Sequence, residues 1–176
     1  MSSVDVDERQ WVEAEERRRK AKEKSKLAHG KPWTVQVDVY LHSETPGDFT
    51  IESYLQTTPG RDELVFYSSH HPGFYVEFHL YDETGLGYQF PSANNEVDGI
   101  WSRLGSTCPL VGTWDVFPGD KTNVKNSGQT LVAFNPNPSP AQGVFQYTLN
   151  VSPDGEPPYL PIDPGGNNMN GGTSFD

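Results

Sequence analysis

The chain has little cysteine and no long apolar run. Cys108 stands alone among 176 residues, so no disulfide forms within the chain and a reducing compartment suits it. Nowhere do eighteen apolar residues follow one another, and the first residues contain no apolar run of signal-peptide length. We therefore expect a cytoplasmic protein with no membrane span, and export without a cleavable signal is the alternative.

Basic residues are scarce in most of the chain. Residues 1–31 hold nine Lys and Arg against seven acids, a formal charge of +2, whereas residues 32–176 hold four against seventeen, a charge of -13. Nucleic-acid binding needs basic side chains that displace counterions from phosphate, and a body this anionic repels a polyanion. We expect a protein or glycan partner and no nucleic acid.

The spacing of metal-ligating residues matches no transition-metal site. All five histidines precede Cys108, and the loop after it contains no imidazole, which excludes a blue-copper site. His70 and His71 adjoin a predicted strand that carries Glu77 and His79, but this spacing fits no zinc pattern. We predict no metal and no cofactor.

Signatures of calcium binding and covalent catalysis are weak or missing. Asp154, Glu156 and Asp163 offer oxygen ligands for a weak calcium site, without the twelve-residue loop pattern. No Gly-x-Ser-x-Gly elbow occurs, and no glycine-rich loop leads into a helix. We predict no catalytic residue and expect a non-enzymatic protein, with a hydrolase of unknown specificity as the less favoured reading.

The charged N-terminal region differs from the rest of the chain. From about residue 5 to 28 it contains good helix formers, no Gly or Pro, acids near its beginning and bases near its end. Gly30 and Pro32 then supply a stop signal. We expect three parts: a charged helical or partly disordered arm at 1–31, a β domain at 32–152, and an irregular segment rich in Pro, Gly and Asn at 153–176.

The predicted arm has two ways to contact the rest of the protein. Its basic residues, between 17 and 26, face a strongly acidic body, which predicts a weak, salt-sensitive contact within one chain or self-association between chains. Trp11 and Val12 offer an apolar docking point instead. A solvated or partly disordered arm is nevertheless the favoured interpretation, because its apolar residues are too sparse for a heptad seam.

Apolar and polar residues alternate with a period of two in segments 34–41, 49–56, 74–81 and 145–151, which is typical of half-buried strands. Shorter strands are predicted at 64–67, 87–90, 114–117 and 130–134. The predicted core comprises Val35, Val37, Val39, Ile51, Phe74, Val76, Phe78, Leu80, Leu131, Phe145, Leu149 and Val151.

Strands that are each buried on one face need two packed sheets or a closed barrel. An aromatic content of 12%, with 17 glycines and 15 prolines, also favours an all-β protein with many turns. We predict an all-β fold, a two-layer antiparallel β-sandwich preceded by one charged N-terminal helix. A Greek-key, cupredoxin-like topology without the copper site is one form that such a sandwich takes.

The water-facing sides of these strands carry tyrosines among polar groups such as Asp38 and Glu52. Tyrosine presents an apolar ring with a polar tip, which suits protein partners and sugars, although it is also simply a good strand residue. We predict an interaction module that binds a protein partner through this face or its loops, with a carbohydrate-binding module as the alternative. The predicted binding residues are Tyr40, Tyr54, Tyr75, Glu77, His79 and Tyr81.

Overall fold

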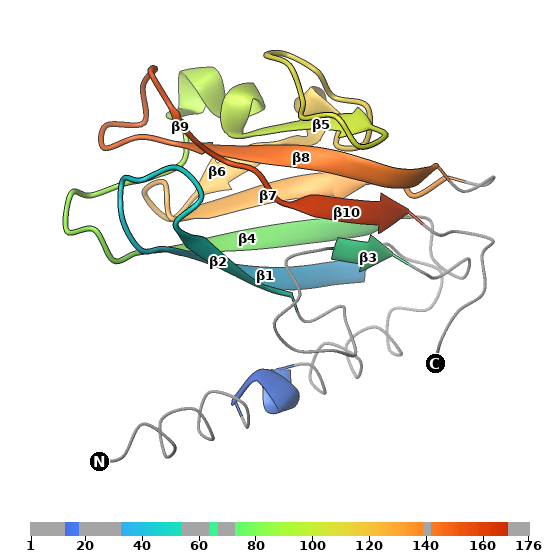
Figure 1. The fold of residues 1–176 in the computed structure, drawn as a ribbon, viewed down its shortest axis with the longest axis horizontal. Helices are drawn as coiled ribbons and strands as arrows, with labels where there is room; N and C mark the ends of the chain where they lie inside the picture. Colours follow the sequence, from blue (N-terminus) through green and yellow to red (C-terminus); the bar gives the residue numbers. More distant parts are fainter. Residues whose placement is uncertain (1–12, 18–32, 54–63, 67–72, 139–141, 169–176) are drawn as a thin grey trace.

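The described part of the protein is mostly β, with two sheets and one short α-helical segment (Figure 1). The computed structural model describes residues 13–17, 33–53, 64–66, 73–138 and 142–168. Of the predicted N-terminal helix, residues 13–17 are helical, and the remainder lies outside the described residues. No helix in the described part of the chain has the length and apolar character to cross a membrane.

The first sheet is mixed rather than antiparallel. Its strands, in spatial order, are β2 (Phe49–Ser53), β1 (Trp33–Leu41), β4 (Phe74–Asp82), β7 (Thr130–Asn135) and β6 (Asn123–Lys125). The central pair, β1 and β4, is parallel over its whole length, and the other neighbours are antiparallel. The prediction of a purely antiparallel fold is therefore wrong, because strands that are distant in sequence pair at the centre of the sheet.

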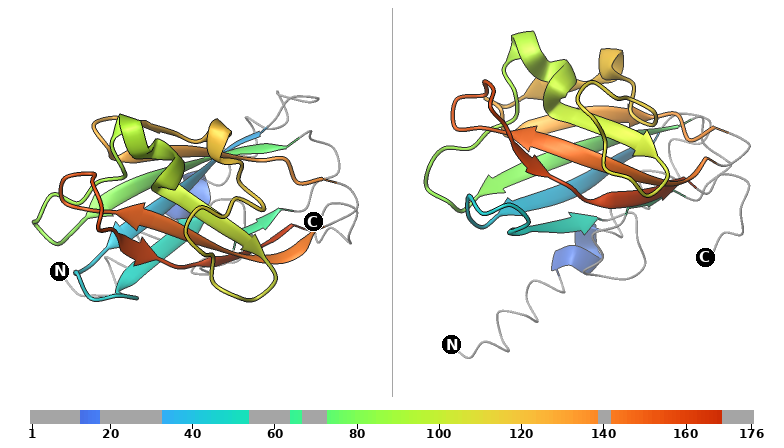
Figure 2. Two further views of the ribbon diagram at one scale, coloured as in Figure 1. Left: turned by 90° about the horizontal axis from the view of Figure 1, so that it is seen from above. Right: turned by 45° about the horizontal axis from the view of Figure 1, so that its top comes forward.

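The second sheet is also mixed and is built around β8 (Gly143–Val151). One edge of β8 pairs with β5 (Ile100–Leu104), and β8 also pairs through successive parts with β9 (Leu160–Ile162) and β10 (Gly165–Asn168). β3 (Leu64–Phe66) pairs in parallel with β10. The right view of Figure 2 shows the short 3₁₀ helices η1 (Ala93–Gly99) and η2 (Gly119–Lys121) on the side away from residues 13–17.

The apolar sides of the two sheets share one buried core. Phe78 of the first sheet lies 5.9 Å from Tyr147 of the second, measured between ring centroids. Both side chains are fully buried, as are Phe66, Phe117 and Phe145 around them. All twelve predicted core residues are buried, so the assignment of the inward-facing side of each strand is confirmed.

The C-terminal region and several short strands differ from the prediction. β9 and β10 lie inside the segment expected to be irregular, because the edge of β8 supplies hydrogen-bond partners that composition does not reveal. β5 and β6 were not predicted at all. The predicted strands at 87–90 and 114–117 are reduced to single bridges, Gln89 with Ser152 and Trp114 with Ser102.

Candidate functional site

The candidate site is the outer face of the first sheet, the side turned away from the shared core. The register places Glu52, Asp38 and His79 side by side on β2, β1 and β4. One row further along, Tyr40 lies beside Tyr81. Successive side chains of a strand alternate between its faces, so residues in these rows all project from the outer face.

Aromatic pairs occupy both ends of this face. The rings of Tyr40 and Tyr81 are stacked, with centroids 4.9 Å apart and an interplanar angle of 16°. At the other end, Tyr75 and Phe134 have ring centroids 5.0 Å apart. Tyr75 and Tyr81 are 39% and 41% exposed, so the face offers apolar area to a partner at two separate points.

Charged side chains lie between the two aromatic pairs. Lys125 of β6 donates a hydrogen bond to Glu77 of β4, with Nζ and Oε1 3.0 Å apart. His79 Nε2 lies 3.5 Å from the other carboxylate oxygen of Glu77 and makes no hydrogen bond with any of the described residues. The centre of the face therefore holds both acidic and basic groups, and the Lys125–Glu77 contact spans β7, which lies between β4 and β6.

Asp38 is buried, contrary to its predicted place on a wet face. Its side chain has no exposed area, and Arg17 of the helical segment 13–17 lies against it. Arg17 Nη1 donates to Asp38 Oδ2 at 2.7 Å, and Gln36 Nε2 donates to Oδ1 at 2.9 Å. The arm thus contacts the body through an ion pair, as the opposite charges of the two parts predicted.

Burial and neighbouring acids perturb the groups around Asp38. Burial, followed by the charges of Glu52 and Asp38, raises the pKa of Tyr40 from 10.0 to about 12. Burial and Asp38 also raise the pKa of Glu52, and the same two causes raise that of Tyr81. The positive charge of Arg17 opposes all three shifts. This corner of the outer face therefore has a negative potential that a cation relieves.

The raised pKa of Tyr40 predicts a specific loss of stability in alkali. The folded state holds the phenol proton more tightly than the unfolded state, so this contribution is complete below pH 10 and is lost as pH rises through about 12. We expect Tyr40→Phe to make the free energy of unfolding fall less steeply over this interval. Urea titrations of both proteins at pH 9 to 12 measure the difference, and parallel pH profiles would contradict it.

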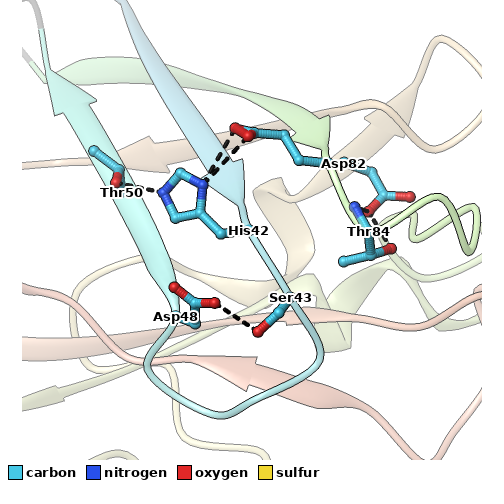
Figure 3. Close-up of polar contacts among 7 residues, drawn as sticks. His42, Ser43, Asp48, Thr50, Asp82 and Thr84 are labelled. Atoms are coloured by element: carbon cyan, nitrogen blue, oxygen red, sulfur yellow. Dashed lines mark hydrogen bonds and ion pairs between the residues drawn. The ribbon is translucent and has the colours of Figure 1, made fainter.

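A second polar cluster holds the loops at one end of the first sheet (Figure 3). His42, just after β1, places Nε2 2.7 Å from Thr50 Oγ1 of β2 and Nδ1 3.2 Å from a carboxylate oxygen of Glu83. In the β1–β2 connection, Ser43 donates to Asp48 at 2.6 Å. These contacts fix the ends of three neighbouring strands.

Asp82, at the end of β4, organises the loop that follows it. Its carboxylate accepts hydrogen bonds from the hydroxyl and amide of Thr84 and from the amides of Gly87 and Tyr88, at 2.6 to 3.0 Å. Desolvation alone would raise the pKa of Asp82, but these hydrogen bonds together outweigh it and lower the pKa. The carboxylate thus stabilises the loop after β4, and it is not part of the candidate binding face.

The three acids considered for calcium are already engaged in hydrogen bonds, namely Asp154, Glu156 and Asp163. Glu156 accepts from Ser92 and Asn95 at 2.6 and 2.8 Å, and Asp163 accepts from the hydroxyl of Thr148. Within the ranges that the structure describes, no group of three or more His, Cys, Asp or Glu residues is arranged to hold a metal ion.

The other ligand candidates are only partly within the described residues. Glu77 and His79 lie next to each other, whereas His70 and His71 lie outside the described ranges. Cys108 is exposed in the loop after β5.

Five of the six predicted binding residues share the outer face, namely Tyr40, Tyr75, Glu77, His79 and Tyr81. Tyr54 lies outside the described residues. Sequence reasoning missed the contribution of Phe134 and Lys125, which reach this face from β7 and β6. The alternation of residues along β7 predicts that Phe134 projects from the outer face. Only the register of the sheet places it beside Tyr75.

Comparison with models of known protein families and with curated proteins finds no match to this chain. A function for the chain has therefore to be inferred from the geometry of the outer face.

Proposed function

We propose that this chain is a non-enzymatic β-sandwich that binds another protein through the outer face of its first sheet. The observation that carries the proposal is the pair of aromatic clusters with charged groups between them. Tyr75 and Tyr81 combine exposed ring area with a hydroxyl tip, and the acids and Lys125 between them offer charge complementarity. Interfaces commonly combine aromatic anchors with charges that fix orientation.

The finer description of the fold belongs to the same proposal. One core cluster formed by residues of both sheets supports a two-layer sandwich. Antiparallel pairing between strands that are not consecutive, such as β4 with β7 and β5 with β8, supports Greek-key connections.

Two observations favour a protein over a glycan as the partner. A side chain from a peptide segment, Arg17, already binds on this face. Tyr40 and Tyr81 also lie against each other, so each ring has one face that is closed to a stacked sugar. A glycan array with the full-length chain tests the carbohydrate alternative, and specific glycan binding that requires Tyr75 or Tyr81 would favour it.

We expect the double change Tyr75→Ser with Tyr81→Ser to leave the fold intact and to weaken partner binding. Loss of a central aromatic anchor commonly costs about 2 kcal/mol or more, which is roughly a thirtyfold rise in the dissociation constant. The partner is first captured with the full-length chain from native lysate and purified. Its dissociation constant is then measured for both proteins by calorimetry, with circular dichroism to check folding.

The matched control changes two exposed apolar residues far from the face. Leu110 and Val111, in the loop after β5, are 65% and 80% exposed. Leu110→Ser with Val111→Ser should leave the affinity unchanged. If this control weakens binding and the tyrosine double variant does not, the loop is the binding surface and the proposal fails.

A further inference from the structure

The outer face contains a buried carboxylate that is neutralised by a side chain from outside the sheet. Asp38 has no exposed side-chain area, and its Oδ2 accepts a hydrogen bond from Arg17 at 2.7 Å. A buried carboxylate is costly unless it is paired with a cation and hydrogen bonded. The body therefore favours a cation at this point, and in the structure the arm supplies it.

The surroundings of Asp38 suit a guanidinium group. Glu52 lies directly across from Asp38 on β2, so two carboxylates face the same cation. The stacked rings of Tyr40 and Tyr81 lie one row away. A planar guanidinium bonds carboxylates through several N–H groups and packs on aromatic rings, whereas an ammonium does neither as well. We call Asp38, Glu52, Tyr40 and Tyr81 the arginine site.

A cationic side chain from another molecule can replace Arg17 beside Asp38. Its side chain is 41% exposed, although its partner Asp38 is fully buried. Fifteen residues separate it from Trp33, the first residue of β1. A ligand that belongs to the same chain competes at a finite effective concentration, which a stronger ligand in solution can exceed.

We infer that the arginine site binds an arginine side chain presented by the protein partner, and that Arg17 is a built-in competitor that fills the site in the free chain. This inference rests on the proposed function, because it names the chemistry that the partner brings to the same face. Binding then requires the partner to displace Arg17 from the arginine site. The arm therefore lowers the apparent affinity for every partner, and only a partner that binds the site more strongly than Arg17 remains bound.

The test uses a fluorescent peptide with the sequence of residues 10–22, which contains the arm's three consecutive arginines. Its dissociation constant is measured by anisotropy at 150 mM salt. One full-length variant, the arginine variant, replaces Arg17, Arg18 and Arg19 with Gln. The matched control, the lysine variant, replaces Lys22, Lys24 and Lys26 with Gln, so it changes the net charge equally.

We expect the arginine variant to bind the peptide at least about tenfold more tightly than the unmodified chain, because the tethered competitor is gone. The lysine variant should show a much smaller increase in affinity for the peptide. Adding Asp38→Asn to the arginine variant should abolish the increase in affinity for the peptide. A peptide with its three arginines replaced by lysine should bind the arginine variant at least about fivefold more weakly, and this comparison does not depend on how Asp38→Asn folds.

Equal increases in affinity for the peptide in the arginine and lysine variants would show that net charge alone causes the increase. This result would overturn the inference. Equal affinity for the arginine and lysine peptides would do the same. Either result, combined with loss of partner binding in the Tyr75→Ser and Tyr81→Ser double variant, leaves the proposed function in place and removes only the arginine site.

Discussion

Replacing Phe78 with Ala should lower the free energy of unfolding by about 3–5 kcal/mol, the largest effect expected from a single core substitution in this chain. The side chain of Phe78 is fully buried at the centre of β4 and contacts Tyr147 of the second sheet. Its removal leaves a cavity between the two sheets as well as losing apolar burial. Such a loss is enough to unfold a domain of marginal stability. Urea denaturation followed by tryptophan fluorescence measures it.

The neighbouring residue on β4 provides the control. His79 points to the outer face, is partly exposed and lies 3.5 Å from Glu77. His79→Ala should cost about 1 kcal/mol or less, as is usual for substitutions away from the core. Similar losses from the two changes would mean that the inward and outward faces of β4 have been assigned wrongly.

Gly128→Val should be the second most damaging change, at about 2–5 kcal/mol, from backbone strain together with overpacking. Gly128 has a φ of +83° in the turn between β6 and β7, where residues with a side chain are strained. A Cβ there would also lie 2.7 Å from Cβ of Gln89. The carbonyl of Gly128 accepts a hydrogen bond from Phe90, so the two segments have little room to separate.

Gly85→Val separates backbone strain from crowding. Gly85 has a nearly equal φ of +77°, but nothing lies within 4 Å of its added Cβ. This change should cost only about 1–2 kcal/mol, the price of the left-handed backbone alone. Thermal or urea unfolding of both variants gives the comparison. A Gly85→Val loss as large as that of Gly128→Val would show that contact with Gln89 contributes nothing.

The sequence predicted the core well because the relevant signal is local. In β1 and β4, inward residues such as Val37 and Phe78 alternate with polar ones, and any pairing of these strands buries the same side. The pattern fails where an inward residue is polar. In β5, Ser102 is fully buried and accepts hydrogen bonds from the amides of Val116 and Phe117, so no apolar alternation marks the strand.

The sequence did not predict features that depend on contacts between distant segments. β9 and β10 contain Pro161 and consecutive glycines, which are typical of irregular chain, and their strand conformation depends on pairing with β8. Asp38 likewise makes an ion pair with Arg17, twenty-one residues away in the chain. Alternation places Asp38 on the outer face correctly, but it cannot show that the side chain is buried there.

Side-chain footprinting of the chain, free and bound to its purified partner, tests most directly whether the outer face is the binding surface. Hydroxyl radicals label side chains according to their accessibility. We expect the partner to protect Tyr75 and Tyr81, which are about 40% exposed in the free chain, and to leave the more exposed Leu110 and Val111 reactive. Protection of Leu110 and Val111 with unchanged labelling of the two tyrosines would contradict the account.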